Sequence, residues 1–255
     1  MPGSSNDFRY LAPYAEDARV RFLRLDSPGH GATPLGDTAP TVEATALFAK
    51  EAATQLLGPS RKYVAVGHSQ GGPVAIKLAH LDDNCVGVAL LCPVTHRPHR
   101  GIRPWWIQQF FTRLSESSAL GRSISVAVMG PPYKALGFFK VSPDELILAV
   151  RRVGYLDFPQ LKEDASTLPK PNALFFSHDD QLIEPAVFAE FSDLLPAGDR
   201  FPFETGGHNI QKFQAEKCAQ GILALVSRLQ CAEKVATDDA AFEDRRPRRD
   251  FEKLA

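Results

Sequence analysis

Five consecutive residues in the first third of the chain have the types and spacing that nucleophilic catalysis requires. Ser69 stands in Gly67-His68-Ser69-Gln70-Gly71, which fits the pattern G-x-S-x-G. In this pattern a sharp turn between a strand and a helix exposes the serine hydroxyl above the edge of a sheet. The helix N-terminus, including the N–H of Gln70, then faces the oxyanion that develops when the serine attacks a carbonyl. The spacing therefore predicts a serine nucleophile at Ser69.

A serine hydroxyl is a weak nucleophile, so it needs a base and an acid that orients the base. His208 lies in the glycine-rich segment Thr205–Asn209, and Asp179 and Asp180 follow the apolar run Ala173–Phe176. An acid directly after a strand lies at the carboxyl edge of a parallel sheet, where the serine turn also lies. We expect Ser69, Asp180 and His208 to form a catalytic triad, with Asp179 as the alternative acid.

The elements that must position these residues are short strands that alternate with helices. This alternation is typical of an α/β fold with a mostly parallel sheet, and continuous apolar runs suit strands that are buried on both faces. The expected strands are Val20–Leu25, Tyr63–Val66, Val86–Leu91, Ala173–Phe176 and Arg200–Glu204. The expected helices are Val42–Leu57, Pro73–His80 and Asn209–Leu229.

Two regions depart from this alternation. Residues 95–168 have helix-like segments and Gly/Pro breaks without a strand, which indicates a helical insertion between two parts of a core at 1–94 and 169–231. Residues 232–255 carry many charges of both signs, which indicates a disordered or loosely helical tail. The aromatic residues of the insertion would line an apolar acyl pocket or form the insertion's own core; they are Trp105, Trp106, Phe110, Phe111, Phe138 and Phe139. Contact of this insertion with a membrane surface is a weaker alternative.

Composition excludes several classes of protein. The 255 residues are 44% hydrophobic and 23% charged, with a formal net charge of -1, so no global field for nucleic acid is expected. No apolar run is long enough for a transmembrane helix, and no secretory signal is visible at the N-terminus, so we expect a cytoplasmic protein. Cys85, Cys92, Cys218 and Cys231 include no C-x-x-C pair, which favours free thiols. The pair His96 and His99 has no further metal ligands nearby, and no metal or other cofactor is expected.

Together these segments resemble the α/β-hydrolase superfamily over about residues 1–230. The resemblance rests on Asp26–Gly31, on GHSQGG at 67–72, on SHDDQLIEP at 177–185 and on GGHN at 206–209. It implies an α/β-hydrolase fold in which residues 95–168 form a cap or lid, and it aligns Asp180 with the catalytic acid. It also implies a serine hydrolase of esterase or lipase type. The substrate would be a small carboxylic ester, thioester or lipid-like acyl compound, cleaved through an acyl-enzyme.

One departure from the family concerns the N-terminus. Members usually begin with further strands and an H-G-x-P-G loop, in which the residue x donates a second N–H to the oxyanion. Here Met1-Pro2-Gly3 aligns with x-P-G, which predicts an N-terminally truncated fold with a gap in its sheet. We take Gln70, Met1 and His68 as the expected oxyanion and substrate-binding residues. A catalytically weak or inactive binding protein on the same fold remains the alternative function.

Overall fold

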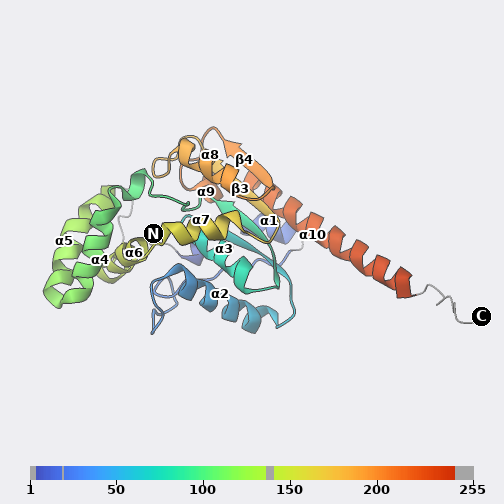
Figure 1. Ribbon diagram of the computed structural model, residues 1–255, viewed down its shortest axis with the longest axis horizontal. Coiled ribbons are helices and arrows are strands. Elements are labelled where there is room, and N and C mark those ends of the chain that lie inside the picture. Colours follow the sequence, from blue (N-terminus) through green and yellow to red (C-terminus); the bar gives the residue numbers. More distant parts are fainter. Residues whose placement is uncertain (1–3, 19, 136–140, 245–255) are drawn as a thin grey trace, which may run out of the picture.

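The computed structural model of the chain describes residues 4–18, 20–135 and 141–244 (Figure 1). Its sheet has four strands in the order β1-β2-β3-β4, and all neighbouring strands are parallel. The strands are β1 (Tyr63–His68), β2 (Cys85–Leu91), β3 (Asn172–Ser177) and β4 (Asp199–Phe203). The expected α/β architecture is therefore present, and four of the five expected strands form within a residue or two of their predicted bounds.

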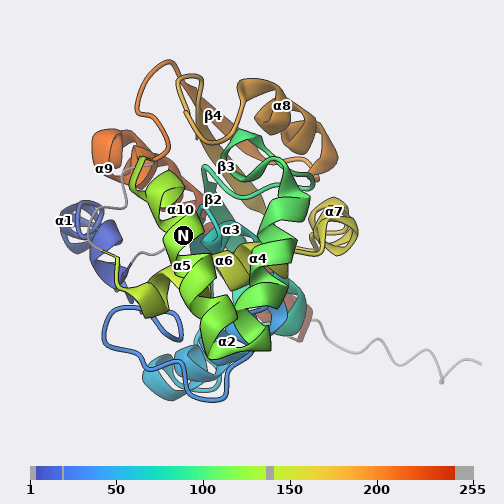
Figure 2. The same cartoon turned by 90° about the vertical axis from the view of Figure 1, so that its left-hand side faces the viewer.

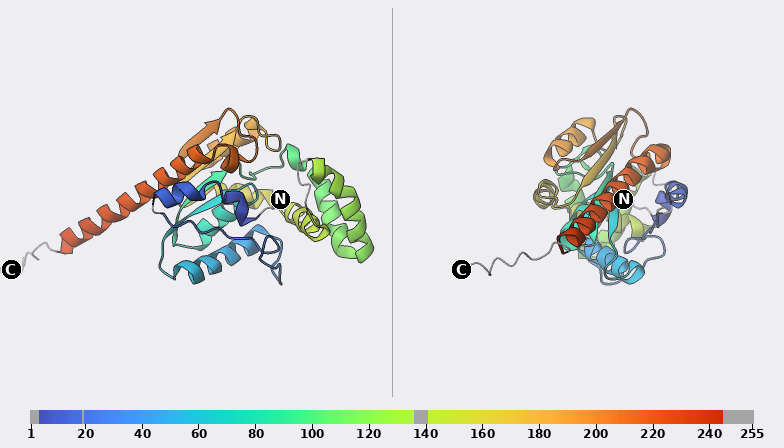
Figure 3. Two further views of the ribbon diagram at one scale, coloured as in Figure 1. Left: turned by 180° about the vertical axis from the view of Figure 1, so that it is seen from behind. Right: turned by 90° about the vertical axis from the view of Figure 1, so that its right-hand side faces the viewer.

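Helices cover both faces of this sheet. On one face α3 (Gly71–Leu81) packs against β1 and β2, and α2 (Val42–Leu57) packs against α3. On the other face lies α10 (Ala215–Asp244), which contacts β2 and β3 and comes to the front when the molecule is seen from behind (Figures 1 and 3). The middle strands are consequently buried on both sides. All of Leu90, Leu91, Leu174 and Phe175 are fully enclosed, as continuous apolar runs predict.

Between β2 and β3 the described residues form four α-helices. Three of them, α4 (Trp105–Ser117), α5 (Ala119–Ala135) and α6 (Pro143–Gly154), pack on one another and project from one end of the sheet (Figures 1 and 2). The fourth, α7 (Phe158–Ser166), runs beside α3. Lys77 of α3 forms a 2.5 Å ion pair with Asp164 of α7, and His80 donates from Nε2 to the Asp164 carbonyl at 2.9 Å. These contacts connect the inserted helices to the body of the molecule. A short helix, α8 (Pro185–Leu194), then follows β3.

The prediction of a strand at Val20–Leu25 is wrong. This segment is irregular, and it lines a cavity of about 1650 Å³ whose other side is formed by β1, from Tyr63 to His68. A strand needs the backbone groups of a neighbour to pair with its own. Within the described chain no backbone hydrogen bond pairs residues 21–25 with a neighbouring strand, although Phe22 packs against the core, so the apolar pattern alone does not produce a strand. The same side of β1 is an open edge of the described sheet.

The two ends of the described chain are helical. A turn of 3-10 helix at Ser5–Phe8 leads to α1 (Ala12–Asp17), which contacts α10. The expected final helix is interrupted at Gln214, which separates α9 (Ile210–Phe213) from α10. The backbone of α10 continues as a helix through Asp244, and residues 245–255 lie outside the described residues.

Membrane-crossing helices and disulfides are both absent from the described residues. Among residues 4–18, 20–135 and 141–244, no helix combines the length and the apolar character that a membrane crossing requires. All four cysteines are free thiols, and three of them are buried, namely Cys85, Cys92 and Cys218.

Candidate functional site

The turn between β1 and α3 places Ser69 at the carboxyl edge of the sheet. Ser69 has a φ of 54°, in the left-handed region that non-glycine residues rarely adopt. Its N–H donates to the Leu91 carbonyl at 3.1 Å, which ties the turn to β2. A Cβ at Gly67 would lie 2.2 Å from the Gly71 carbonyl oxygen, so only glycine lets the turn close this tightly. The G-x-S-x-G pattern thus has a local steric cause.

His208 lies in the loop after β4, and hydrogen bonds to Asp179 stabilise this loop. The Asp179 carboxylate accepts hydrogen bonds from the N–H groups of Gly206 and Gly207 at 3.2 and 2.7 Å. Both glycines have positive φ, 140° and 60°, which turns the chain back toward the sheet edge. The His208 ring is then 2.9 Å from the serine, measured from Nε2 to Ser69 Oγ.

Asp180 contacts the other side of this ring. Its Oδ2 is 2.8 Å from His208 Nδ1, while its Oδ1 accepts from the N–H groups of Leu182 and Ile183 at 2.8 and 3.0 Å. The carboxylate is fully buried. Burial by itself raises the pKa of Asp180, but the hydrogen bonds from His208, Ile183 and Leu182 hold that pKa below its ordinary value. An ionised Asp180 accepts from Nδ1–H, and this leaves Nε2 free to accept the Ser69 proton.

The structure thus brings Ser69, His208 and Asp180 into one hydrogen-bonded chain. Of the two adjacent acids, Asp180 touches the His208 ring and Asp179 touches only its loop. Sequence reasoning named Asp179 as an alternative acid and missed its contact with the glycine N–H groups. The only local signal for that contact was the pair of glycines before His208.

The other three expected site residues have different surroundings. Gln70 precedes α3, and among the described residues no backbone carbonyl accepts a hydrogen bond from its N–H. His68 lies under His208: its Nε2 donates to the His208 carbonyl at 2.8 Å, and its Nδ1 is 3.4 Å from Gln211 Nε2. Burial lowers the pKa of His68 to about 3, so its ring is neutral. Met1 lies outside the described residues.

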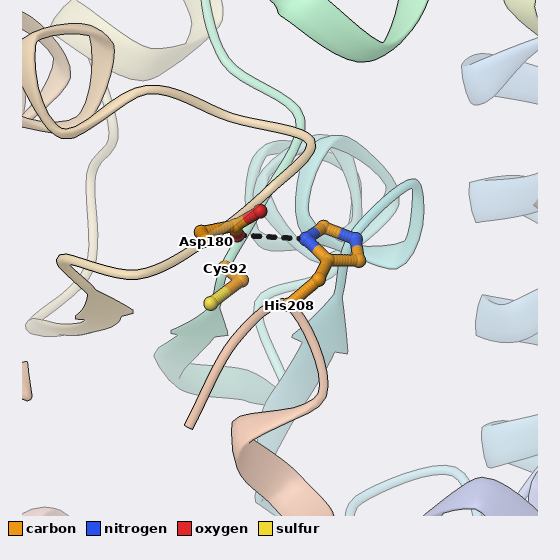
Figure 4. A group of neighbouring side chains, drawn as sticks. All are labelled: Cys92, Asp180 and His208. Atoms are coloured by element: carbon orange, nitrogen blue, oxygen red, sulfur yellow. Dashed lines mark hydrogen bonds and ion pairs between the residues drawn. The ribbon is translucent and has the colours of Figure 1, made fainter. Parts of the chain in front are cut away.

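Cys92 lies beneath the acid and the base. Its Sγ, an Asp180 carboxylate oxygen and a His208 ring nitrogen all lie within 4.8 Å of one another (Figure 4). Burial raises the pKa of the Cys92 thiol well above its ordinary value, and the negative charge of Asp180 raises it further. Both ring nitrogens of His208 already have partners, since Nδ1 contacts Asp180 and Nε2 contacts Ser69. The arrangement therefore fits a hydrogen-bonded histidine and carboxylate better than a metal centre.

Ser69 and His208 line the same large cavity as β1, and most of its remaining lining is apolar. The described aromatic residues of the insertion do not line it, so of the two alternatives, an acyl pocket and the insertion's own core, they do not form the pocket. Trp105 packs on Phe158 and Phe111 packs on the cluster around Met129, whereas Trp106 and Phe110 are 65% and 54% exposed. Phe138 and Phe139 lie outside the described residues. Residues that face the cavity from this side include Ala135 and Arg152.

Comparison with known proteins agrees with this architecture. The model of the alpha/beta hydrolase family matches residues 1–220. A lipase-esterase related protein from Clostridium acetobutylicum ATCC 824 is similar in structure, with a TM-score of 0.66, 19% identity and coverage of 87% of this chain and 89% of that one. No curated protein is significantly similar to the chain.

Two esterases give similar values. The esterase from Exiguobacterium antarcticum has a TM-score of 0.66 and 18% identity, with 90% and 89% of the two chains covered. A thermophilic esterase from Thermogutta terrifontis, solved with malate bound, has a TM-score of 0.69 and 19% identity, with 90% and 87% covered. At such identities the likeness shows the fold, and it confirms the expected α/β-hydrolase fold.

Proposed function

Since the chain belongs to the alpha/beta hydrolase family, we propose that it is a serine hydrolase that cleaves the ester or thioester bond of a small acyl substrate. The observation that carries this proposal is the continuous contact from Ser69 Oγ through the His208 ring to Asp180, at 2.9 and 2.8 Å. Both distances lie within hydrogen-bonding range for a nucleophile, its base and the group that orients the base. The proposal also takes residues 95–168 as a cap over this site.

In the first half of the proposed reaction, Ser69 attacks the acyl carbonyl while His208 Nε2 accepts the serine proton. The charged imidazole that results is stabilised by the buried Asp180 carboxylate. The tetrahedral intermediate then collapses: its C–O or C–S bond to the leaving group breaks, and His208 returns the proton to the leaving oxygen or sulfur. The product of this half-reaction is an acyl-enzyme at Ser69.

In the second half, His208 removes a proton from water, and the resulting hydroxide attacks the acyl-enzyme carbonyl. The second tetrahedral intermediate then collapses: its bond to Ser69 Oγ breaks, the carboxylic acid leaves, and His208 returns the proton to Ser69 Oγ. In both intermediates the N–H of Gln70 is the proposed donor to the oxyanion, because it stands at the N-terminus of α3 without a described backbone acceptor. His68 supports the base indirectly through its contact with the His208 carbonyl.

The test is covalent labelling of the purified chain with a fluorophosphonate, followed by mapping of the adduct by mass spectrometry. We expect one adduct at Ser69, and Ser69→Ala must abolish it. Ser177→Ala is the matched control, since Ser177 is a second buried serine at a strand end and contacts Asp179 rather than His208. A folded chain that is not labelled at Ser69, and that hydrolyses neither p-nitrophenyl esters nor acyl thioesters, would contradict the proposal and favour a binding protein.

A further inference from the structure

A cation faces the cavity that contains Ser69 and His208. Arg152, on α6, is largely buried and lines this cavity. One terminal nitrogen of its guanidinium donates to the Pro28 carbonyl at 2.8 Å, but its buried Nε–H has no hydrogen-bond partner. Within the described part of the chain, no carboxylate lies within ion-pair distance of Arg152. A buried donor without a partner and a buried charge without a counter-charge both carry a cost in free energy.

A buried histidine, His30, shares the carbonyl that this guanidinium contacts. The Nδ1 of the His30 ring lies 3.3 Å from the same Pro28 carbonyl, so the ring and the guanidinium are neighbours at one oxygen. His30 is 4% exposed. Burial, and next the charge of Arg152, lower its pKa to about 4, so the ring is neutral near pH 7.

Two acidic groups that interact electrostatically with His30, Glu145 and Asp26, already have other hydrogen-bond partners. Glu145, one of the acidic groups that act on His30, accepts hydrogen bonds from the N–H and hydroxyl of Ser142. Asp26 accepts from the N–H groups of Ser5 and Ala32. Burial lowers the pKa of Arg152 to about 10, which still leaves the guanidinium charged at neutral pH. The local arrangement therefore provides a fixed positive charge with an unused donor and no anion of its own.

We propose that Arg152, hydrogen-bonded to the Pro28 carbonyl beside His30, binds a carboxylate of the substrate, so that the preferred esters or thioesters carry an anionic acyl group. This inference rests on the proposed function, because it concerns the substrate of the same cavity. The planar guanidinium suits a carboxylate, since its N–H groups match the two oxygens. The alternative is a purely structural Arg152 that joins α6 to the Pro28 loop.

The experiment measures kcat/KM for matched pairs of p-nitrophenyl esters, after subtraction of the rate without enzyme. Each pair joins a neutral acyl chain to the hemiester of equal length: butyrate with succinate, pentanoate with glutarate, and hexanoate with adipate. In the wild type we expect at least one hemiester to exceed its neutral partner by about tenfold or more, the effect of one charge-assisted contact. If no hemiester is preferred, the inference is wrong.

Arg152→Met should reduce that hemiester-to-neutral ratio by about tenfold, and Arg152→Lys, which keeps the charge but not the fork, should restore part of it. Arg151→Met is the matched control: Arg151 is the preceding residue on α6, and its partner is Glu116 on α4. That control should leave the ratio and the rates unchanged. A merely structural Arg152 would lower the melting temperature and both rates without changing the ratio, and this result would overturn the inference.

Direct binding separates a failure of the subsite from a failure of the proposed function. Calorimetric titration of glutarate into Ser69→Ala should show binding, and Ser69→Ala/Arg152→Met should lose about tenfold in affinity or more. Binding without any ester hydrolysis would retain the carboxylate subsite and reject the hydrolase. Hydrolysis of neutral esters without Arg152-dependent glutarate binding would retain the hydrolase and reject the subsite.

Discussion

Replacing Asp180 with asparagine gives a sharp test of how the site works. The two oxygens of Asp180 have different partners: Oδ1 accepts from two backbone N–H groups, and Oδ2 accepts from His208 Nδ1. In Asp180→Asn the side-chain amide oxygen continues to accept from the N–H groups of Leu182 and Ile183. The opposite orientation of the amide is unfavourable, because its NH₂ group would then face these two N–H donors. In the favoured orientation the NH₂ group faces the His208 ring.

This orientation forces His208 into the wrong tautomer. Its Nδ1 must accept from the amide, so the proton moves to Nε2, where it prevents the ring from taking the Ser69 proton. We expect kcat to fall by roughly 10⁴-fold, as loss of the correct tautomer does in serine hydrolysis. This corresponds to a barrier increase of about 5.5 kcal/mol. Stopped-assay kinetics on a p-nitrophenyl ester and the rate of fluorophosphonate labelling both measure it.

Asp179→Asn is the matched control, because Asp179 is the preceding residue and contacts the glycine N–H groups instead of the ring. It weakens charge-assisted hydrogen bonds to the loop but leaves the tautomer of His208 unchanged, so we expect a loss of about tenfold. Circular dichroism must show that both variants fold. Equal losses in the two variants, or a folded Asp180→Asn that keeps a tenth of the activity, would refute the reasoning.

Two further predictions concern stability. Gly67→Ala should destabilise the fold by about 1–3 kcal/mol or more in urea unfolding, because its Cβ would lie 2.2 Å from a carbonyl oxygen. Gly71→Ala is the control and should be tolerated, because no atom lies within 4 Å of a Cβ at that position. Similar stabilities of the two variants would contradict the steric account of the turn. Acidification should also destabilise the fold. Burial lowers the pKa values of His30, His68 and His99 in the folded chain to about 4, 3 and 4. Between pH 6.5 and 4 these histidines therefore bind protons mainly in the unfolded chain. Each histidine should therefore remove about 1.4 kcal/mol of unfolding free energy per pH unit below pH 6.5, measured by urea titrations at several pH values, and a flat profile over this range would show that the rings are not held neutral.

Most strands could be predicted because their signals are local. The apolar runs of β1, β2 and β3 are bounded by turn residues, and each run has a partner in the sheet. Val20–Leu25 also has apolar residues typical of a strand. Whether a strand forms depends, however, on a neighbouring segment with which it can pair, and the sequence of the segment itself carries no information about that neighbour. Trp106 and Phe110 are another case in which the sequence does not determine the environment of a side chain, because both are largely exposed. Residue type indicates that a side chain suits a pocket, but only the assembled helices decide which way it points.

The site could be predicted to the level of its motifs. Ser69 and His208 each lie in a glycine-rich turn whose conformation is determined by residues close in sequence. The spacing of glycines around each residue was therefore enough to predict its position in the site. The choice between Asp179 and Asp180 was different, because successive residues after a strand point in different directions. The contacts that distinguish them involve Gly207 and His208, which lie 28 residues further along the chain. Arg152 was not singled out, since its role depends on contact with a carbonyl 124 residues away.

The open edge of β1 has a consequence for how the molecule loses activity. Ser69 extends from a strand that is paired on one side only in the described sheet, whereas Asp180 follows β3, which is paired on both sides. Local openings begin where backbone pairing and packing are weakest. An opening that separates β1 from β2 would carry the serine hydroxyl away from the imidazole while the rest of the sheet stays folded. On warming, the reactivity of Ser69 would then disappear below the temperature at which the whole domain melts.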